Sequence, residues 1–108
     1  MTYDVQITLQ AEYDLRSIFE YIAYELQSVQ NAIGQLRRLE QSIDSLNQMP
    51  ERFRIYPKEP WRSRGLRVMP VDHYLVFYVP NPASGMVSIV RVLYGGRNIE
   101  QQLTQLTT

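Results

Sequence analysis

Four side chains in the second half of the chain have the chemistry needed to act on a phosphate group: Arg67, His73, Tyr94 and Arg97. An arginine offers a planar fork of donors to phosphate oxygens, and an imidazole or a phenol hydroxyl exchanges a proton. RNA cleavage through the 2′-hydroxyl of its own ribose needs positioning, a proton acceptor and charge stabilisation, but no metal. We therefore assign these four residues a catalytic role that holds only if the protein cuts RNA. The competing interpretation makes His73 a polar residue at a strand edge and Tyr94 part of the core.

A second candidate surface is the basic stretch of residues 51–67, where six basic and two acidic side chains give a net charge of +4. Residues 1–50 have seven acidic and three basic side chains, a net charge of −4, so a neutral chain is unevenly charged. Aromatic residues are interleaved with the arginines of the basic stretch. Two interpretations stay open: a binding face for an acidic partner or polyanion, and a solvated loop that balances the acidic helices.

The composition excludes several kinds of site. A length of 108 residues predicts a single domain over residues 1–108. With no cysteine and one histidine, the chain has no disulfide, thiolate zinc site or cysteine nucleophile, and we expect no metal and no cofactor. The segment Gly95-Gly96-Arg97 lacks the Gly-Lys-Ser/Thr ending of a phosphate-binding loop, so we interpret its glycines as a positive-φ exit from a strand.

Nothing in the sequence indicates a membrane or an export signal. No apolar run approaches the roughly 18–20 residues of a membrane helix. The first ten residues alternate in polarity and contain an acid, unlike a signal peptide. We therefore expect a cytoplasmic protein.

The first half of the chain predicts a strand and a helical hairpin that would support these candidates. Residues 3–7 alternate as in a half-buried strand, Thr8 suits a helix N-cap, and a break over 27–31 contains Ser28 or Asn31 as the next cap. Met49-Pro50 should end the second helix. We expect six side chains of the hairpin to be buried against a sheet: Leu15, Ile18, Ile22, Leu36, Leu39 and Ile43.

The second half predicts a loop over 51–63, three strands and a short helix. The strands are expected over 66–69, ended by Pro70, over 73–79 and over 86–94. The last two are apolar on nearly both faces, which indicates central positions in the sheet. Asp72 is interpreted as a turn residue, and Asn98 as the cap of a helix over 99–106. The order β-α-α-β-β-β-α predicts an α+β fold, with the helical hairpin packed on one face of a mainly antiparallel sheet.

Several short segments carry a resemblance to a known family. They are Val5-Gln6-Ile7-Thr8, Pro50-Glu51-Arg52, Gly65-Leu66-Arg67, Tyr74-Leu75-Val76-Phe77-Tyr78 and Val90-Arg91-Val92-Leu93-Tyr94-Gly95-Gly96-Arg97. The last block, of the form Arg-Val-Leu-aromatic-Gly-x-Arg, is the most specific. On these segments the chain resembles the RelE/ParE superfamily of bacterial type II toxin–antitoxin toxins over nearly its whole length.

The superfamily divides by activity, and the resemblance separates the two branches. RelE-like members cut mRNA on the ribosome and have an arginine in a Tyr-Arg-Leu-Val-Tyr type strand, where this chain has Tyr74; Arg67 and Arg97 match other basic positions. ParE-like members, which inhibit DNA gyrase, usually read Tyr-Leu-Ile-Phe-Tyr there. The resemblance thus favours a ParE-like growth inhibitor that acts on gyrase by binding and not as an enzyme. The alternatives are a RelE-like ribosome-dependent mRNA endoribonuclease and a degenerate member that only binds its partner.

A cognate antitoxin is the partner that the resemblance implies in every case. Such partners wrap an extended and helical segment over the toxin, and the basic stretch suits an acidic partner with apolar anchors. The residues that we predict to bind the antitoxin are Arg52, Arg54, Tyr56, Trp61, Arg62 and Arg64.

Overall fold

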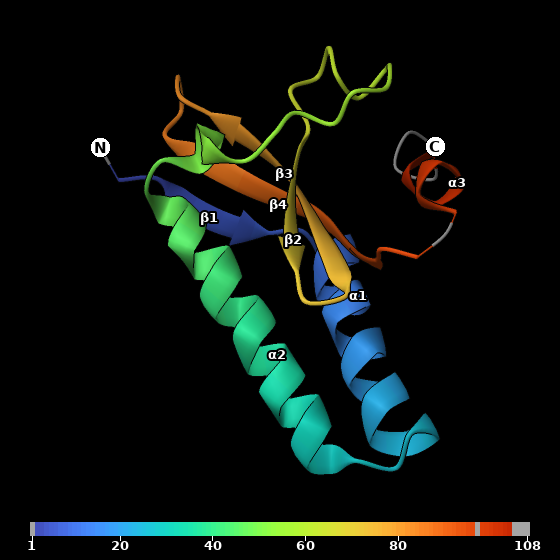
Figure 1. The fold of residues 1–108 in the computed structure, drawn as a ribbon. Coiled ribbons are helices and arrows are strands. Elements are labelled where there is room, and N and C mark those ends of the chain that lie inside the picture. The colour runs from blue at the N-terminus through green and yellow to red at the C-terminus, as the bar shows by residue number, and fades with distance from the viewer. Residues whose placement is uncertain (1, 97, 105–108) are drawn as a thin grey trace.

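The computed structural model describes residues 2–96 and 98–104, and their strands and helices follow the predicted order (Figure 1). The strands are β1 (Asp4–Ile7), β2 (Arg67–Val71), β3 (Tyr74–Asn81) and β4 (Met86–Tyr94). The α-helices are α1 (Leu9–Glu20), α2 (Val29–Asp44) and α3 (Ile99–Thr104). Short turns of other helix types are η1 (Tyr21–Glu25), η2 (Ser45–Asn47) and η3 (Pro50–Arg52). The predicted extension of the last helix to residue 106 lies outside the described residues.

The four strands form one mixed sheet in the order β1-β4-β3-β2. β1 runs parallel to β4, with Asp4 opposite Met86, while β3 is antiparallel to both of its neighbours. The prediction that the two most apolar strands are central is confirmed, because β3 and β4 each have a neighbour on both sides. The first two strands of the chain lie at opposite edges of the sheet.

The first helix of the hairpin is capped by Thr8 as predicted, and of the two candidate caps for the second helix the structure uses Ser28. The Thr8 hydroxyl accepts a hydrogen bond from the Ala11 N–H at 3.2 Å, and the Ser28 hydroxyl accepts one from the Asn31 N–H at 3.3 Å. The predicted end of the second helix is wrong by several residues. α2 ends at Asp44 and continues as the 3₁₀ turn η2 to Asn47. Gln48 is then extended, and Met49 takes a left-handed conformation (φ 48°) before Pro50.

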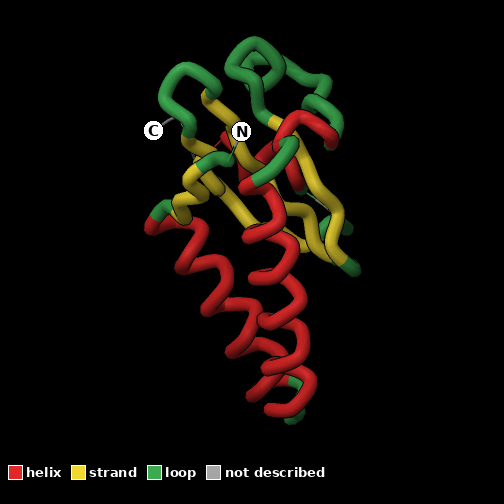
Figure 2. The backbone as a smooth tube through the Cα atoms, turned by 90° about the vertical axis from the view of Figure 1, so that its left-hand side faces the viewer, coloured by secondary structure: helices red, strands yellow, loops and turns green. Residues whose placement is uncertain are grey.

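The hairpin packs on one face of the sheet, and five of the six predicted core residues take part. Leu15, Leu39 and Ile43 are buried there, and Ile18 and Leu36 pack partly buried against them. Ile22 is the exception. It packs with Ala23 and Ala32 in a small separate cluster, because the two helices extend well past the sheet (Figures 1 and 2).

The opposite face of the sheet is also covered, which the sequence did not predict. The loop over residues 53–66 and helix α3 lie over it, so the structure has a second core (Figure 1). Its buried residues are Trp61, Leu66, Val68, Phe77, Leu93 and Leu103. In the described part of the chain, no helix combines the length and apolarity that crossing a membrane requires.

Two predicted strand limits are wrong for reasons of sheet position. Pro70 lies inside β2, exposed and opposite Leu75, where it was predicted to end the strand. Because β2 is an edge strand, the missing proline N–H removes no bond that the sheet needs. His73 belongs to the two-residue turn between β2 and β3, and β3 runs on to Asn81.

Where β1 ends, helix α1 provides the next hydrogen-bond partner for the edge of β4. The Thr8 N–H donates to the carbonyl of Ile89 at 3.1 Å as the last bond of the parallel pair. Beyond it, the Val92 N–H donates to the Asp14 carboxylate at 2.9 Å. The same carboxylate binds the guanidinium of Arg91 at 2.7 Å. A side chain of α1 thus supplies the acceptor that a longer β1 would have supplied.

Candidate functional site

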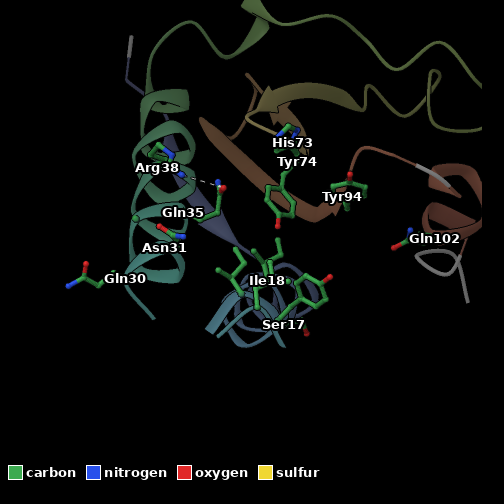
Figure 3. A pocket seen from close by; sticks show the side chains of 14 residues that line it. Ser17, Ile18, Gln30, Asn31, Gln35, Arg38, His73, Tyr74, Tyr94 and Gln102 are labelled. Carbon is green, nitrogen blue, oxygen red and sulfur yellow. Dashed lines mark hydrogen bonds between the residues drawn. The ribbon is translucent and has the colours of Figure 1, made fainter. Parts of the chain in front are cut away.

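An open groove of about 1140 Å³ lies between the helical hairpin and the end of the sheet where β3 begins and β4 ends (Figure 3). Its walls come from α1, η1, α2 and that sheet end, with one residue from α3. The polar and aromatic residues that line it are Ser17, Tyr21, Gln30, Asn31, Gln35, Arg38, His73, Tyr74, Tyr94 and Gln102. The volume exceeds what a drug-sized molecule fills, so the groove can hold a segment of a larger partner.

Two tyrosines form the sheet side of the groove. Tyr74 and Tyr94 are direct partners in the β3–β4 ladder, and their rings meet edge to face with centroids 6.0 Å apart and planes at 77°. Burial, with Tyr94 and Tyr21 nearby, raises the pKa of the Tyr74 hydroxyl above its usual value. At neutral pH Tyr74 is therefore an uncharged hydrogen-bonding group, not a phenolate base.

The glycines after β4 are needed for space, which corrects the positive-φ interpretation. Neither Gly95 nor Gly96 has a positive φ; Gly65 and Gly85 do. A Cβ at Gly96 would lie 2.4 Å from the ring of Tyr94, and one at Gly95 would lie 3.3 Å from the carbonyl of His73. The pair of glycines therefore lets the Tyr94 ring fold back beside the turn.

An ion pair at the groove neutralises its arginine. Nε of Arg38 lies 2.8 Å from Oδ2 of Asp72, which also accepts a bond from Nε2 of Gln35 at 2.9 Å. Hydrogen bonds from Arg38 and then Gln35 lower the pKa of the Asp72 carboxyl. Asp72 is a turn residue as predicted, with a φ of 55°, and it also ties the β2–β3 turn to α2.

The groove brings together two of the four residues given a conditional catalytic role. His73 and Tyr94 both line it (Figure 3), and the carbonyl of His73 accepts the Gly95 N–H at 2.9 Å. Arg97 lies outside the described residues. Among the described lining residues, Arg38 is the one lysine or arginine, and it is paired with Asp72.

Arg67 lies at the other end of the sheet. It faces Tyr78 in the ladder, whereas the groove begins at Tyr74. Its Nη1 donates to the carbonyl of Phe53 at 2.7 Å and to that of Glu51 at 3.1 Å. The structure therefore does not bring Arg67 together with His73 and Tyr94, because β2 starts at the end where β3 finishes.

The residues predicted to bind an antitoxin all lie on the loop side of the molecule, but their environments differ. Trp61 is buried in the second core, with the guanidinium of Arg64 5.4 Å from its ring centroid. Tyr56 is half-buried and meets Phe77 edge to face. Arg54 and Arg62 are exposed. All four arginines of the set are thus exposed, whereas its two aromatic residues are buried or half-buried.

Arg52 of the same set donates hydrogen bonds to backbone carbonyls at a helix end. Its Nη1 donates to the carbonyls of Gln48 at 2.6 Å, Met49 at 3.2 Å and Ser45 at 3.3 Å. These carbonyls belong to η2 and the residues just after it, so the guanidinium satisfies acceptors at a helix end.

Comparison with known proteins decides the family. The family described as "ParE toxin of type II toxin-antitoxin system, parDE" matches residues 5–99. This chain belongs to that ParE toxin family. The resemblance drawn from the sequence segments is confirmed. A comparison of this ParE toxin with curated proteins found no match.

Solved structures share the fold of this ParE toxin. The chromosomal ParDE system from P. aeruginosa is 17% identical with a TM-score of 0.70, covering 86% of this chain and 96% of that one. The RelBE2 toxin–antitoxin complex from Mycobacterium tuberculosis is 20% identical with a TM-score of 0.60, covering 87% and 99%. The archaeal RelE-RelB complex from Pyrococcus horikoshii OT3 is 22% identical with a TM-score of 0.59, covering 91% and 100%. At these identities the likeness shows the fold alone.

The helical side of the groove was not predicted from the sequence of this ParE toxin. Gln35 and Arg38 lie three residues apart and so share one face of α2, a spacing that can be read from sequence. Their common partner Asp72 is 37 residues from Gln35, and only the fold reveals it. Tyr21 was also missed, because it lies beside the buried stripe of the first helix and not within it.

Proposed function

We propose that this ParE toxin is neutralised by a cognate antitoxin and stops growth by binding DNA gyrase, without cutting RNA. The single observation that carries the choice of target is the charge state of the groove. Its described lining contains one arginine, Arg38, and that side chain is already bonded to Asp72. The resemblance to the superfamily implies an arginine in RNA-cleaving members at the position of Tyr74, which is an uncharged phenol at neutral pH.

This lack of free positive charge argues against phosphoryl-transfer chemistry. Cleavage of RNA develops negative charge on the phosphate, and losing one preorganised donor typically costs on the order of 10²–10³ in rate. Arg67 is held by backbone carbonyls at the other end of the sheet. Inhibition by binding makes no such demand on the groove.

One observation favours the alternative, a RelE-like ribosome-dependent endoribonuclease. His73, Tyr74 and Tyr94 meet at one end of the sheet, where they line the groove together. An imidazole and two phenols can position and protonate an RNA substrate. The alternative then requires Arg97 to supply the missing charge.

The antitoxin is proposed from the family and from charge. The comparison structures include toxin–antitoxin complexes of related fold. On this chain, Arg54, Arg62 and Arg64 are exposed in a segment of net charge +4, beside the half-buried Tyr56. An acidic partner with apolar anchors would match this surface.

The test of the target runs two reactions on one purified sample. In the first, toxin is added to gyrase and relaxed plasmid; in the second, to ribosomes programmed with mRNA. We expect loss of supercoiling in the first, relieved by the antitoxin, and intact mRNA in the second. Cleavage at codon positions that disappears with Arg97→Ala would contradict the gyrase proposal. No effect in either reaction, with antitoxin binding intact, would identify a degenerate member that only binds its partner.

A further inference from the structure

The far end of the helical hairpin exposes a group of large apolar side chains. We call it the hairpin tip, and it consists of Tyr21, Tyr24, Leu26, Val29 and Ile33. Each of the five is between 44% and 67% exposed. The helices extend past the sheet at this end (Figures 1 and 2), and two of the five residues, Tyr21 and Leu26, also line the groove. Large apolar residues gathered within 13 positions and left in water are typical of a surface that binds another molecule.

Backbone hydrogen bonds fix the conformation of the hairpin tip, which carries these exposed side chains. α1 ends in the π-helical turn η1, in which the Leu26 N–H donates to the carbonyl of Tyr21 at 3.1 Å. Gln27 then adopts a φ of 56°, and the Ser28 N–H donates to the carbonyl of Ile22 at 3.1 Å. A π-helical turn is rare and is frequently found at functional sites.

A small core of its own supports the tip. Ile22, Ala23 and Ala32 are buried between the two helices. The two alanines are almost completely buried, while the larger side chains of the tip are exposed. The exposed residues are therefore not what holds the hairpin together, and polar substitutions there should leave the fold intact.

The charge around the tip restricts the kind of partner. Residues 17–36 contain Glu20 and Glu25 and no lysine, arginine or histidine. The basic loop over residues 53–66 lies at the opposite end of the molecule (Figure 1). An acidic rim repels the phosphates of nucleic acid and attracts basic side chains, so charge complementarity selects a protein surface with apolar pockets and a basic rim.

We propose that the hairpin tip is the surface by which this toxin holds its protein target, through apolar pockets edged by lysine and arginine on that target. This inference rests on the proposed function, inhibition of gyrase by binding. It also separates two surfaces: the acidic, apolar tip binds the target, and the basic loop binds the antitoxin.

The experiment compares tip variants with matched controls on the intact toxin and gyrase holoenzyme. The tip variant is Tyr24→Ser/Leu26→Ser; the control is Tyr13→Ser/Leu9→Ser, which removes the same two residue types from exposed positions of α1. We expect the tip variant to lose on the order of 10² in gyrase affinity and inhibition, and the control to stay within about twofold. Antitoxin affinity and thermal unfolding should be unchanged in both.

A second pair of variants tests the charge argument without touching apolar contacts. Glu20→Gln/Glu25→Gln should slow association with gyrase at low salt and reduce its dependence on salt. The control Glu12→Gln/Glu40→Gln removes two exposed acids from the hairpin outside residues 17–36 and should change neither. Equal association rates for both pairs would overturn the assignment of a basic-rimmed partner.

The outcomes distinguish the inference from the proposal beneath it. If wild-type toxin neither binds nor inhibits gyrase, the proposed function fails and this inference fails with it. If wild-type toxin inhibits gyrase and the folded tip variant inhibits equally well, the inference alone is overturned. Loss of antitoxin binding by the folded tip variant would also overturn it, because the tip would then belong to the antitoxin.

Discussion

The carboxylate of Asp14 on α1 accepts two hydrogen bonds from the guanidinium of Arg91 on β4, at 2.7 and 2.9 Å. Both side chains are only 8% exposed. The remaining donor of Arg91, Nη1, bonds the carbonyl of Gln102 in α3 at 3.2 Å. Asp14 also accepts the Val92 N–H. One ion pair thus joins the first helix, a central strand and the last helix.

Removing one partner of this pair should be costly. Asp14→Ala leaves the Arg91 guanidinium buried without a counter-charge, and we expect the free energy of unfolding to fall by about 3–5 kcal/mol. Urea unfolding measures it. Glu12→Ala, an exposed acid on the same helix, is the control and should change stability by no more than about 0.5 kcal/mol. A fall below about 1 kcal/mol for Asp14→Ala would show that the pair does not hold these elements together.

Tyr78 should make the protein lose stability in alkali. Its buried hydroxyl donates to the carbonyl of Pro50 at 2.6 Å, and burial raises its pKa to about 12. The unfolded chain releases this proton near pH 10, so the folded state holds it more tightly and stability falls as pH rises from about 10 to about 12.

Tyr78→Phe tests this by unfolding at a series of pH values. At neutral pH the variant should be less stable by about 1–3 kcal/mol, because the buried carbonyl of Pro50 loses its donor. Between pH 10 and 12 it should lose less additional stability than the wild type. Tyr13→Phe, at an exposed position, is the control for the number of tyrosines. Parallel pH curves for Tyr78→Phe and wild type would contradict the linkage.

The main core should contribute more to the free energy of unfolding than the small cluster in the hairpin. Leu39 is fully buried between α2 and the sheet, so Leu39→Ala should cost about 2–5 kcal/mol. Ile22→Ala should cost less, since its cluster lies beyond the sheet and can relax. Urea unfolding of the two variants compares them directly, and a larger loss for Ile22→Ala would reverse this ranking.

The basic loop should govern the approach of the antitoxin. Charge reversal by Arg62→Glu/Arg64→Glu should slow association on the order of tenfold at low salt and weaken its salt dependence. Stopped-flow mixing at several salt concentrations measures both. Arg16→Glu/Arg37→Glu changes the net charge equally on the exposed hairpin helices and should have a smaller effect. If the two double variants behave alike, the antitoxin docks away from the loop.

Features with a local cause could be predicted from the sequence. The limits of β4 match because the turn residues before it and Gly95 after it are visible without the fold. The cap at Thr8 is likewise read from neighbouring positions, and the second cap was narrowed to Ser28 or Asn31. The helical hairpin and the central strands followed from periodicity and from apolar composition.

Features that depend on sheet order could not be predicted. Pro70 is tolerated because its strand is at an edge, and Trp61 is buried because a loop covers the second face. Asp14 and Arg91 lie 77 residues apart, and each alone resembles a surface charge. For the site, His73 and Tyr94 share the groove, but Arg67 does not, since the direction of β2 relative to β3 decides which strand ends meet.

The parallel pair of β1 and β4 also determines when the sheet can be completed during synthesis of the chain. Thr8 bonds Ile89, 81 residues further along the chain, so the sheet closes only when the strand that contains Ile89 has been synthesised. Contacts of such long sequence separation form late and slowly. A nascent chain on the ribosome holds its first strand and hairpin without the sheet that must receive them. The complete sheet can therefore form only in chains whose translation has passed β4.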